Sequence, residues 1–148
     1  MVSPEVLRRY PYFAGIGEAT LKAIAMIAEE ESVAAGTQLF SEGDKVAALS
    51  VIVRGEIDIQ YLLGNGELRT VDTLMDGELL CWSALVEPFR CTATAKAVKK
   101  TELVSIAADK LRELCDNDPL LGYKLGLRVA KLLAHRLEST RLQLASLS

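Results

Sequence analysis

The sequence predicts an α+β fold in which about eight antiparallel strands form a jelly-roll barrel between N-terminal and C-terminal helices. Three observations predict it: apolar residues recur at helical spacing at both ends of the chain, they alternate with a period of two in its middle, and glycines separate the alternating runs. The chain has 148 residues, half of them hydrophobic, so it can bury one core without disulfides. We expect a single domain over 1–148, with N-terminal helices at 1–30, a β-roll at 31–108 and C-terminal helices at 109–148.

The N-terminal part of the chain is expected to be helical over residues 4–30. Its apolar positions follow the helical period until the acidic run at 29–31 ends the segment. The residues that show this period are Leu21, Ile24, Ala25 and Ala28. The first residues lack an apolar run after their charges, and no later stretch reaches the roughly 18 apolar residues of a membrane span. We therefore expect a cytoplasmic location and no membrane partner.

Alternation replaces the helical period in the middle of the chain. The runs at 49–53 and 57–61 have an apolar residue at every second position, which is typical of half-buried antiparallel strands. Residues 64–66, Gly-Asn-Gly, predict a hairpin because Asn-Gly supplies the positive φ angles of tight primed turns. Strands at 92–97 and 101–107 complete the set.

Two helices are expected after the strands. Asp109 is placed to cap a short helix that ends at Cys115, and Asp118 followed by Pro119 marks the start of a long one. Apolar residues of the long helix form a first stripe, Leu121, Leu125, Val129 and Leu132, and a second stripe, Tyr123, Leu127, Ala130, Ala134, Leu137 and Leu144. We expect the first stripe to cover the β-roll and the second to form a homodimer. The alternative is that both stripes are buried against the same barrel.

The segment at 80–95, LCWSALVEPFRCTATA, joins a short helical turn, a proline corner and a strand of small residues. It resembles the phosphate-binding cassette of the cyclic nucleotide-binding domain family, which includes the sensor domains of catabolite activator-like proteins. The segments at 35–44 and 49–57 resemble the family's glycine hairpin and its strand-glycine-strand pattern, with Gly43 and Gly55 as the glycines. The resemblance covers most of the chain and implies a jelly roll with a ligand pocket at the cassette.

In the resembled family, amides at the start of the cassette helix face a cyclic phosphate, a glutamate accepts a ribose hydroxyl and an arginine binds the phosphate. The resemblance places these amides at Ser83 and Ala84. It also places Trp82 at the glutamate position and Cys91 at the arginine position. An indole and a thiol supply neither contact, so the resemblance implies weak binding of a cyclic nucleotide or binding of another small anion.

The remaining features of the cassette each have two interpretations. Arg90 either reaches the phosphate through a rearranged loop or stays in solvent at the loop edge. Trp82 either fills the pocket or stacks on a flat ligand. Thr92 either meets an anion or is simply a good β-former. Cys81 and Cys91, which both border the ligand in the resembled family, either form a reversible redox pair or pack as ordinary thiols.

The composition and the motifs argue against several functional classes. A formal charge of −3 and a pI near 5.3 do not suit a nucleic-acid surface. The three cysteines show no CxxC pairing and the lone His135 lies far from them, so neither a disulfide framework nor a metal site is indicated. No nucleophile and base occur in a recognisable pattern. We expect a protein that is not an enzyme and that uses no cofactor.

These expectations lead to a sensory or regulatory domain that dimerises, binds a small anionic ligand and signals through an unidentified protein partner. The sequence stops where transcription regulators of the resembled superfamily continue into a helix-turn-helix domain. If the 148 residues are the whole product, its output is expected to be a protein contact. The alternatives are a ligand-independent dimerisation or interaction module and a redox sensor built on Cys81 and Cys91.

Overall fold

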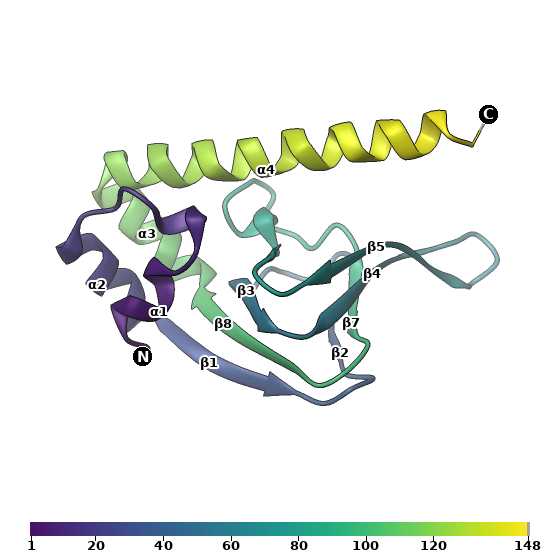
Figure 1. Ribbon diagram of the computed structural model, residues 1–148, viewed down its shortest axis with the longest axis horizontal. Coiled ribbons are helices and arrows are strands. Elements are labelled where there is room, and N and C mark those ends of the chain that lie inside the picture. The colour runs from purple at the N-terminus through teal and green to yellow at the C-terminus, as the bar shows by residue number, and fades with distance from the viewer. Residues whose placement is uncertain (148) are drawn as a thin grey trace.

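Two four-stranded antiparallel sheets form the centre of the computed structural model, which describes residues 1–147 (Figure 1). The first sheet has the order β1 (Ala28–Val33), β8 (Thr101–Ala107), β3 (Ala48–Arg54) and β6 (Leu79–Leu80), and the second has the order β2 (Gln38–Phe40), β7 (Thr94–Ala97), β4 (Glu56–Leu62) and β5 (Leu68–Met75). The expected jelly roll is therefore confirmed. The sheets are not closed into a barrel, because the edge strands β2 and β6 have only three and two residues to offer to a ladder. The last residue of the expected segment 109–148 lies outside the described residues.

The N-terminal helices are shorter than the expected segment at 4–30. Helix α1 (Pro4–Arg8) and the 3-10 turn η1 (Pro11–Phe13) precede α2 (Glu18–Met26). The acidic run at 29–31 lies in β1 rather than at a helix end, which corrects the sequence-based boundary. The physical reason is that β1 pairs with β8 along its whole length, while its position at the sheet edge leaves the three carboxylates exposed to water.

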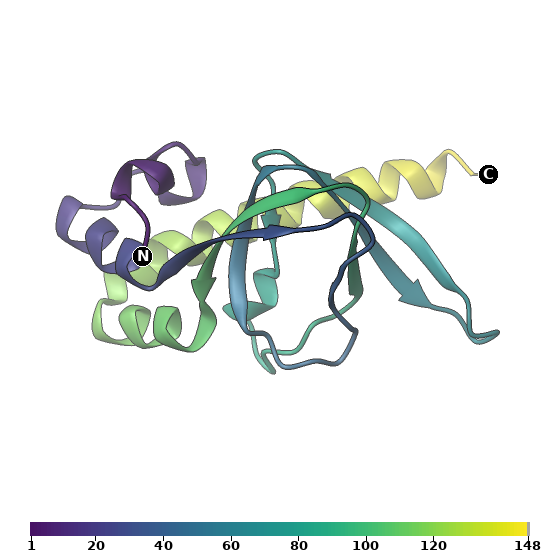
Figure 2. The ribbon, with the colours of Figure 1, turned by 90° about the horizontal axis from the view of Figure 1, so that it is seen from below.

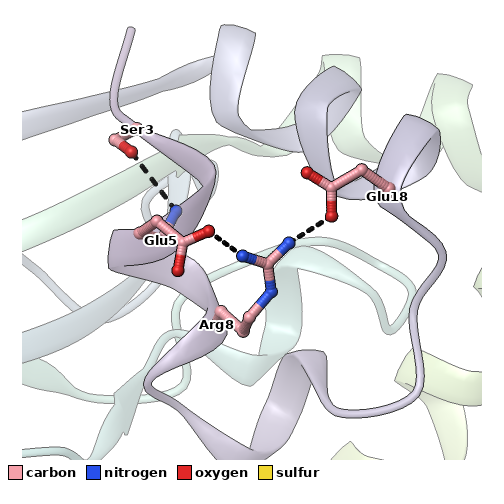
Figure 3. Close-up of polar contacts among 4 residues, drawn as sticks. All are labelled: Ser3, Glu5, Arg8 and Glu18. Carbon is pink, nitrogen blue, oxygen red and sulfur yellow. Dashed lines mark hydrogen bonds and ion pairs between the residues drawn. The ribbon is translucent and has the colours of Figure 1, made fainter.

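Polar contacts join α1 to α2 at this end of the molecule (Figure 3). Arg8 contacts Glu5 of its own helix and Glu18 in the first turn of α2. Ser3 caps α1, because its hydroxyl accepts a hydrogen bond from the Glu5 amide. These ion pairs are exposed, so they help to orient the short helices but add little to the free energy of unfolding.

The expected hairpin at 64–66 is confirmed, because β4 and β5 pair along their whole length. The turn differs from the expected primed type, since only Gly66 has a positive φ, at 87°. The Gly66 amide donates to the Leu63 carbonyl over 3.0 Å, as in a type I turn that is closed by one left-handed glycine. The hairpin extends away from the rest of the sheet, on the same side as the C-terminal half of the last helix (Figure 1).

Helices α3 (Ala108–Asn117) and α4 (Pro119–Ala145) follow the strands. Asp118 caps α4 as predicted, since its carboxylate accepts a hydrogen bond from the Leu121 amide. The expected cap at Asp109 is wrong, because this residue lies inside the first turn of α3. Strand β8 continues directly into α3, and backbone carbonyls of neighbouring segments accept the amide hydrogens at the junction. No side-chain cap is needed there.

The apolar stripes of α4 have different environments. Leu121, Leu125 and Val129 of the first stripe are buried against the core, as predicted. The large residues of the second stripe are exposed, namely Tyr123, Leu127, Leu137 and Leu144. The alternative in which both stripes are buried against the same β-roll is therefore wrong. Among residues 1–147, the structure contains no helix with the length and apolar character that a membrane crossing requires.

The chain passes from the first sheet to the second at Gly55, between β3 and β4. Its φ of +144° is rarely adopted by residues with a side chain. A Cβ at this position would lie 2.3 Å from Oγ1 and 2.7 Å from Cα of Thr101. This close approach explains the glycine of the strand-glycine-strand pattern. The core between the two sheets contains Ile52, Ile57, Leu74, Leu80, Ala95 and Leu103.

Candidate ligand-binding site

A groove of about 730 Å³ lies between the cassette, the second sheet and α4. Figure 1 shows the cassette beneath the middle of α4, with the β4–β5 hairpin beside it. The cassette contributes Cys81, Trp82, Ser83, Cys91 and Thr92, the sheet contributes Ile59, Tyr61, Val71, Asp72 and Leu74, and α4 contributes Leu133, His135, Arg136, Leu137, Ser139, Thr140 and Gln143. Apolar walls with a few hydroxyl and charged groups are typical of a small-molecule site.

The cassette starts where β6 ends. Cys81 has a φ of 70°, in the left-handed region, and turns the chain out of the strand. The expected cassette helix has the form of a single 3-10 turn, η2 (Trp82–Ala84). The amide of Ala84 donates to the Cys81 carbonyl over 3.0 Å, which closes this turn.

The end of the cassette joins the second sheet later than expected. Strand β7 begins at Thr94 rather than at Thr92. The reason is that Cys91 bonds to the loop that follows β2: its amide donates to the Asp44 carbonyl over 2.7 Å, and its carbonyl accepts from the Gly43 amide over 2.8 Å. The turn at Gly43 therefore fixes one wall of the groove.

Arg112 of α3 contacts two residues of the cassette, and the sequence analysis did not identify it. Its Nη1 donates to the Ala84 carbonyl over 2.8 Å. Its guanidinium carbon also lies 4.1 Å from the centre of the Phe89 ring, a cation–π distance. One side chain thus contacts both ends of the cassette bend. A single arginine on an amphipathic helix gives no sequence signal for such a contact.

The structure brings five of the seven predicted site residues to the groove and leaves two outside it. Ala84, the last residue of η2, is fully buried, and its amide already donates to the Cys81 carbonyl, so a ligand could use this amide only if that hydrogen bond opened. Arg90 is exposed and forms an isolated backbone bridge with Lys45. Its position agrees with the interpretation that its side chain stays in solvent. Ligand contact by any of the seven residues stays a prediction.

Trp82 is half-buried and has two kinds of neighbour. Its indole packs against the core cluster that includes Val51, Leu79 and Ala84, and it also lines the groove. Both interpretations of Trp82, as a filler and as a stacking surface, are compatible with this position. Thr92 is exposed at the groove, outside the strand that was expected to contain it.

Cys81 and Cys91 both line the groove, one at the start of the cassette and the other after its bend. Burial raises the pKa of both thiols, and the neighbouring sulfur raises that of Cys81 further. At Cys91 the Asp44 carboxylate also raises the pKa, while the hydrogen bond from Cys81 opposes the rise. All three cysteines of the chain are free thiols, and Cys115 lies on α3, away from this pair.

Arg136 of α4 places a guanidinium in the groove, and the sequence analysis missed it. Its Nη2 donates to the Leu79 carbonyl over 2.9 Å, and the side chain is half-buried. Within residues 1–147 no carboxylate lies within 4.0 Å of this guanidinium. The signal that could have identified it is its spacing, because Arg136 continues the first stripe of α4 four residues after Leu132 and seven after Val129. The cassette lacks the glutamate and the arginine of the resembled motif, whereas α4 supplies a positive charge through Arg136.

The loop between β5 and β6 is held on two sides. The Tyr12 hydroxyl donates to the Gly77 carbonyl over 2.9 Å, while Arg136 binds the Leu79 carbonyl. Burial raises the pKa of Tyr12, and the nearby Arg136 partly offsets that rise. Glu78 accepts a hydrogen bond from the Met75 amide over 2.6 Å. Both Glu78 and Asp72 line the groove, so it contains two carboxylates beside its guanidinium.

Among residues 1–147 there is no cluster of three or more His, Cys, Asp or Glu side chains that could hold a metal ion. His135 is exposed on α4 at the edge of the groove, in agreement with its interpretation as a surface residue.

The comparison with protein families gives one match: the model of the cyclic nucleotide-binding domain matches residues 30–118. A curated relative is the cyclic AMP receptor protein of Thermus thermophilus, which is 32% identical over 113 residues, 76% of this chain and 50% of the relative. The chain thus spans about half the length of this relative. The description of the family indicates no catalytic activity.

Solved structures show the same fold. A Geobacter metallireducens protein described as a cyclic nucleotide-binding protein is 34% identical, with a TM-score of 0.84 over 93% of this chain and 99% of its own. The regulatory domain of Toxoplasma gondii PKA, crystallised with cAMP, is 25% identical, with a TM-score of 0.67 over 75% of this chain and 42% of its own.

Proposed function

The chain belongs to the cyclic nucleotide-binding domain family, and from this premise we propose that it is a non-enzymatic regulatory domain whose groove binds a small monoanionic ligand. The candidate ligands are a cyclic nucleotide, bound weakly, and another organic anion of similar size. The observation that carries the proposal is Arg136: a half-buried guanidinium that faces a groove of about 730 Å³ and has no ion-pair partner among residues 1–147. Arginine presents several donors in a planar fork that suits phosphate and carboxylate groups.

The charges around the groove favour a ligand with one negative charge. Asp72 and Glu78 line the same groove as Arg136, so a group with a higher negative charge would be repelled by these carboxylates. A cyclic phosphate diester has one ionisable oxygen, whereas a phosphate monoester carries about −1.5 to −2 charges near pH 7. The hydroxyls of Ser83, Ser139 and Thr140 and the same carboxylates supply acceptors for a sugar or a similar polar ring.

Trp82 provides a direct assay, because it is the only tryptophan of the chain and it lines the groove. We expect saturable changes in its fluorescence, and a matching rise in melting temperature, on titration with cAMP or cGMP. 5′-AMP and inorganic phosphate serve as the more highly charged comparisons. If none of these compounds, nor a set of organic monoanions, changes either signal, the domain is a ligand-independent interaction module.

Two arginine variants test the site itself. Arg136→Gln removes the charged donor and is expected to weaken binding about 10- to 100-fold, the loss that corresponds to one charged hydrogen bond. Arg141→Gln is the matched control, because Arg141 is exposed on the same helix and does not line the groove. Equal affinity in the wild type and the Arg136→Gln variant would contradict the assigned site. Arg90→Ala is expected to leave binding unchanged, since Arg90 lies outside the groove.

The regulatory output is proposed to pass through a homodimer that is formed by the second stripe of α4. The residues Tyr123, Leu127 and Leu137 are more than half exposed, at 64%, 52% and 51%, and they lie on one side of the helix. Helices with exposed residues at this spacing pair readily with a second copy. Light scattering of Leu127→Glu is expected to give a monomer, while Leu142→Glu, also exposed but off the stripe, keeps the dimer. A wild-type monomer at all concentrations would contradict this part of the proposal.

A further inference from the structure

A second cavity, of about 350 Å³, opens between the two sheets, and no residue of α4 lines it. Its inner end is formed by Leu80 and Leu103, which are at most 2% exposed and belong to the core between the sheets. Its mouth is formed by exposed residues, namely Glu31 of β1 and Asp44 and Lys45 of the loop after β2. The cavity therefore leads from the solvent into the β-roll.

Two serine hydroxyls lie in this cavity, at positions where the strands otherwise present core residues. Ser50 stands two residues before the core residue Ile52 in β3, so both side chains lie on the face that meets the second sheet. Ser105 stands two residues after the core residue Leu103 in β8 and lies on the same face. Both serines are 6% exposed and lie opposite each other in the β3–β8 ladder. Their Oγ atoms form a hydrogen bond of 2.8 Å.

This pair leaves one hydroxyl hydrogen without an acceptor. Each serine has a single O–H, and the bond between the two oxygens uses only one of the two hydrogens. Within residues 1–147, neither hydroxyl has a second hydrogen-bond partner. A buried O–H without an acceptor costs free energy, and two alanines would fill the same positions without that cost. The pair therefore contributes a hydrogen-bond donor that a bound molecule can use.

We propose that this cavity binds a small neutral molecule that has an apolar body and one oxygen acceptor, such as a ketone or an ester. Apolar side chains, among them Leu39 and Phe40, form much of its wall, so the inner end disfavours a charged group. The buried O–H requires an acceptor, which an ammonium group lacks. A carboxylate would supply one, but the two carboxylates and the single ammonium at the mouth together repel an anion. A ketone oxygen accepts the hydrogen bond without carrying a charge.

The site is distinct from the ligand groove beside α4. Ser50 and Ser105 line only the second cavity, and Arg136 lines only the groove. The two spaces share four lining residues, Phe40, Leu80, Cys81 and Cys91. The proposal therefore does not depend on whether the groove binds an anion.

Three soluble probes with the same phenyl ring test the ligand class on the wild-type chain. Acetophenone is neutral and has a carbonyl acceptor, benzoate is an anion, and benzylammonium is a cation. Amide NMR spectra of the isotope-labelled chain should show saturable shifts at Ser50 and Ser105 with acetophenone, with a dissociation constant of about 0.1–10 mM, as for other ligands of this size. Benzoate and benzylammonium are expected to bind there at least about 10-fold more weakly.

A double variant, Ser50→Ala with Ser105→Ala, tests the hydroxyl pair. Its melting temperature is expected to stay close to that of the wild type, because both partners of one hydrogen bond are removed together. Its affinity for acetophenone is expected to fall about 3- to 10-fold, the loss of one neutral hydrogen bond. Ser32→Ala is the matched control, because Ser32 is an exposed serine of β1 that lines neither cavity.

Three results would overturn the proposal. The first is the absence of saturable shifts at both serines with acetophenone, which is expected of a cavity that holds only water. The second is equal affinity for acetophenone in the wild type and the double variant. The third is binding of benzoate or benzylammonium at these serines as tightly as acetophenone. The probe series on the wild type needs no variant, so it decides the question even if the double variant does not fold.

Discussion

The substitution Gly55→Ala tests the junction at which β3 passes into β4. The new Cβ would lie 2.3 Å from Oγ1, 2.6 Å from Cβ and 2.7 Å from Cα of Thr101. Thr101 cannot move easily, because it is fully buried and its hydroxyl donates to the Lys99 carbonyl over 2.9 Å. The clash costs about 1–3 kcal/mol as overpacking, and the φ of +144° costs about 1–3 kcal/mol more for a residue with a side chain. We expect the free energy of unfolding to fall by about 2–6 kcal/mol.

The assay is urea unfolding followed by the fluorescence of Trp82, the only tryptophan. Gly126→Ala is a control for which the opposite change in the free energy of unfolding is expected. Gly126 lies in the interior of α4, and nothing lies within 4 Å of a Cβ added to it. This variant is expected to stabilise the protein by about 0.5–1 kcal/mol, because alanine favours the helix. A loss below about 1 kcal/mol for Gly55→Ala would refute the steric reasoning, since each of its two contributions alone is at least about that value.

Three further predictions concern contacts that the fold depends on. Arg112→Gln removes the bond to the Ala84 carbonyl and the contact with Phe89, and urea unfolding should show a loss of about 1–3 kcal/mol. Asp118→Ala removes the cap of α4 and should cost about 1 kcal/mol in the same assay, with an unchanged dependence on urea concentration. The pKa values of the three thiols are raised above their ordinary value near 9 in the folded chain, so the unfolded chain loses protons first and the free energy of unfolding should fall as the pH rises above about 9. Cys115→Ser should lessen that fall, and a pH series of urea curves measures it.

The sequence predicted the strands and the long helix well, because their signals are local. Alternation at 49–53 and 57–61 predicted two strands, and both runs are strands in the structure. The run at 49–53 was expected to be half-buried, but residues 49–52 are all buried, so both faces of β3 are covered. Asp118 with the following proline predicted the start of α4 for the same reason, since a cap and the first turn are neighbours in the chain. The errors occur where contacts with distant segments of the chain determine the local conformation. The acidic residues at 29–31 are in a strand because β8, more than 70 residues later, pairs with them.

The candidate site shows the same division between local and distant information. The cassette sequence located the groove, and five of its seven candidate residues line it, because a short continuous segment forms one wall. The charged group came from elsewhere: only the packing of α4 across the cassette brings Arg136 within 2.9 Å of the Leu79 carbonyl. Nothing in the spacing of Ala84 and Phe89 predicts that Arg112 contacts both.

Periodicity and turn residues by themselves determined most of the architecture of this protein, namely which segments are strands and which are helices. The resemblance of 80–95 to a phosphate-binding cassette implied the place of the pocket. Local conformation follows from steric and hydrogen-bonding preferences that act over a few residues, so it can be read along the chain. The tertiary structure alone decided that Arg136 supplies a positive charge to the groove and that Arg112 contacts the cassette. Those contacts join residues that are far apart in sequence, and their geometry is set by how sheets and helices pack together.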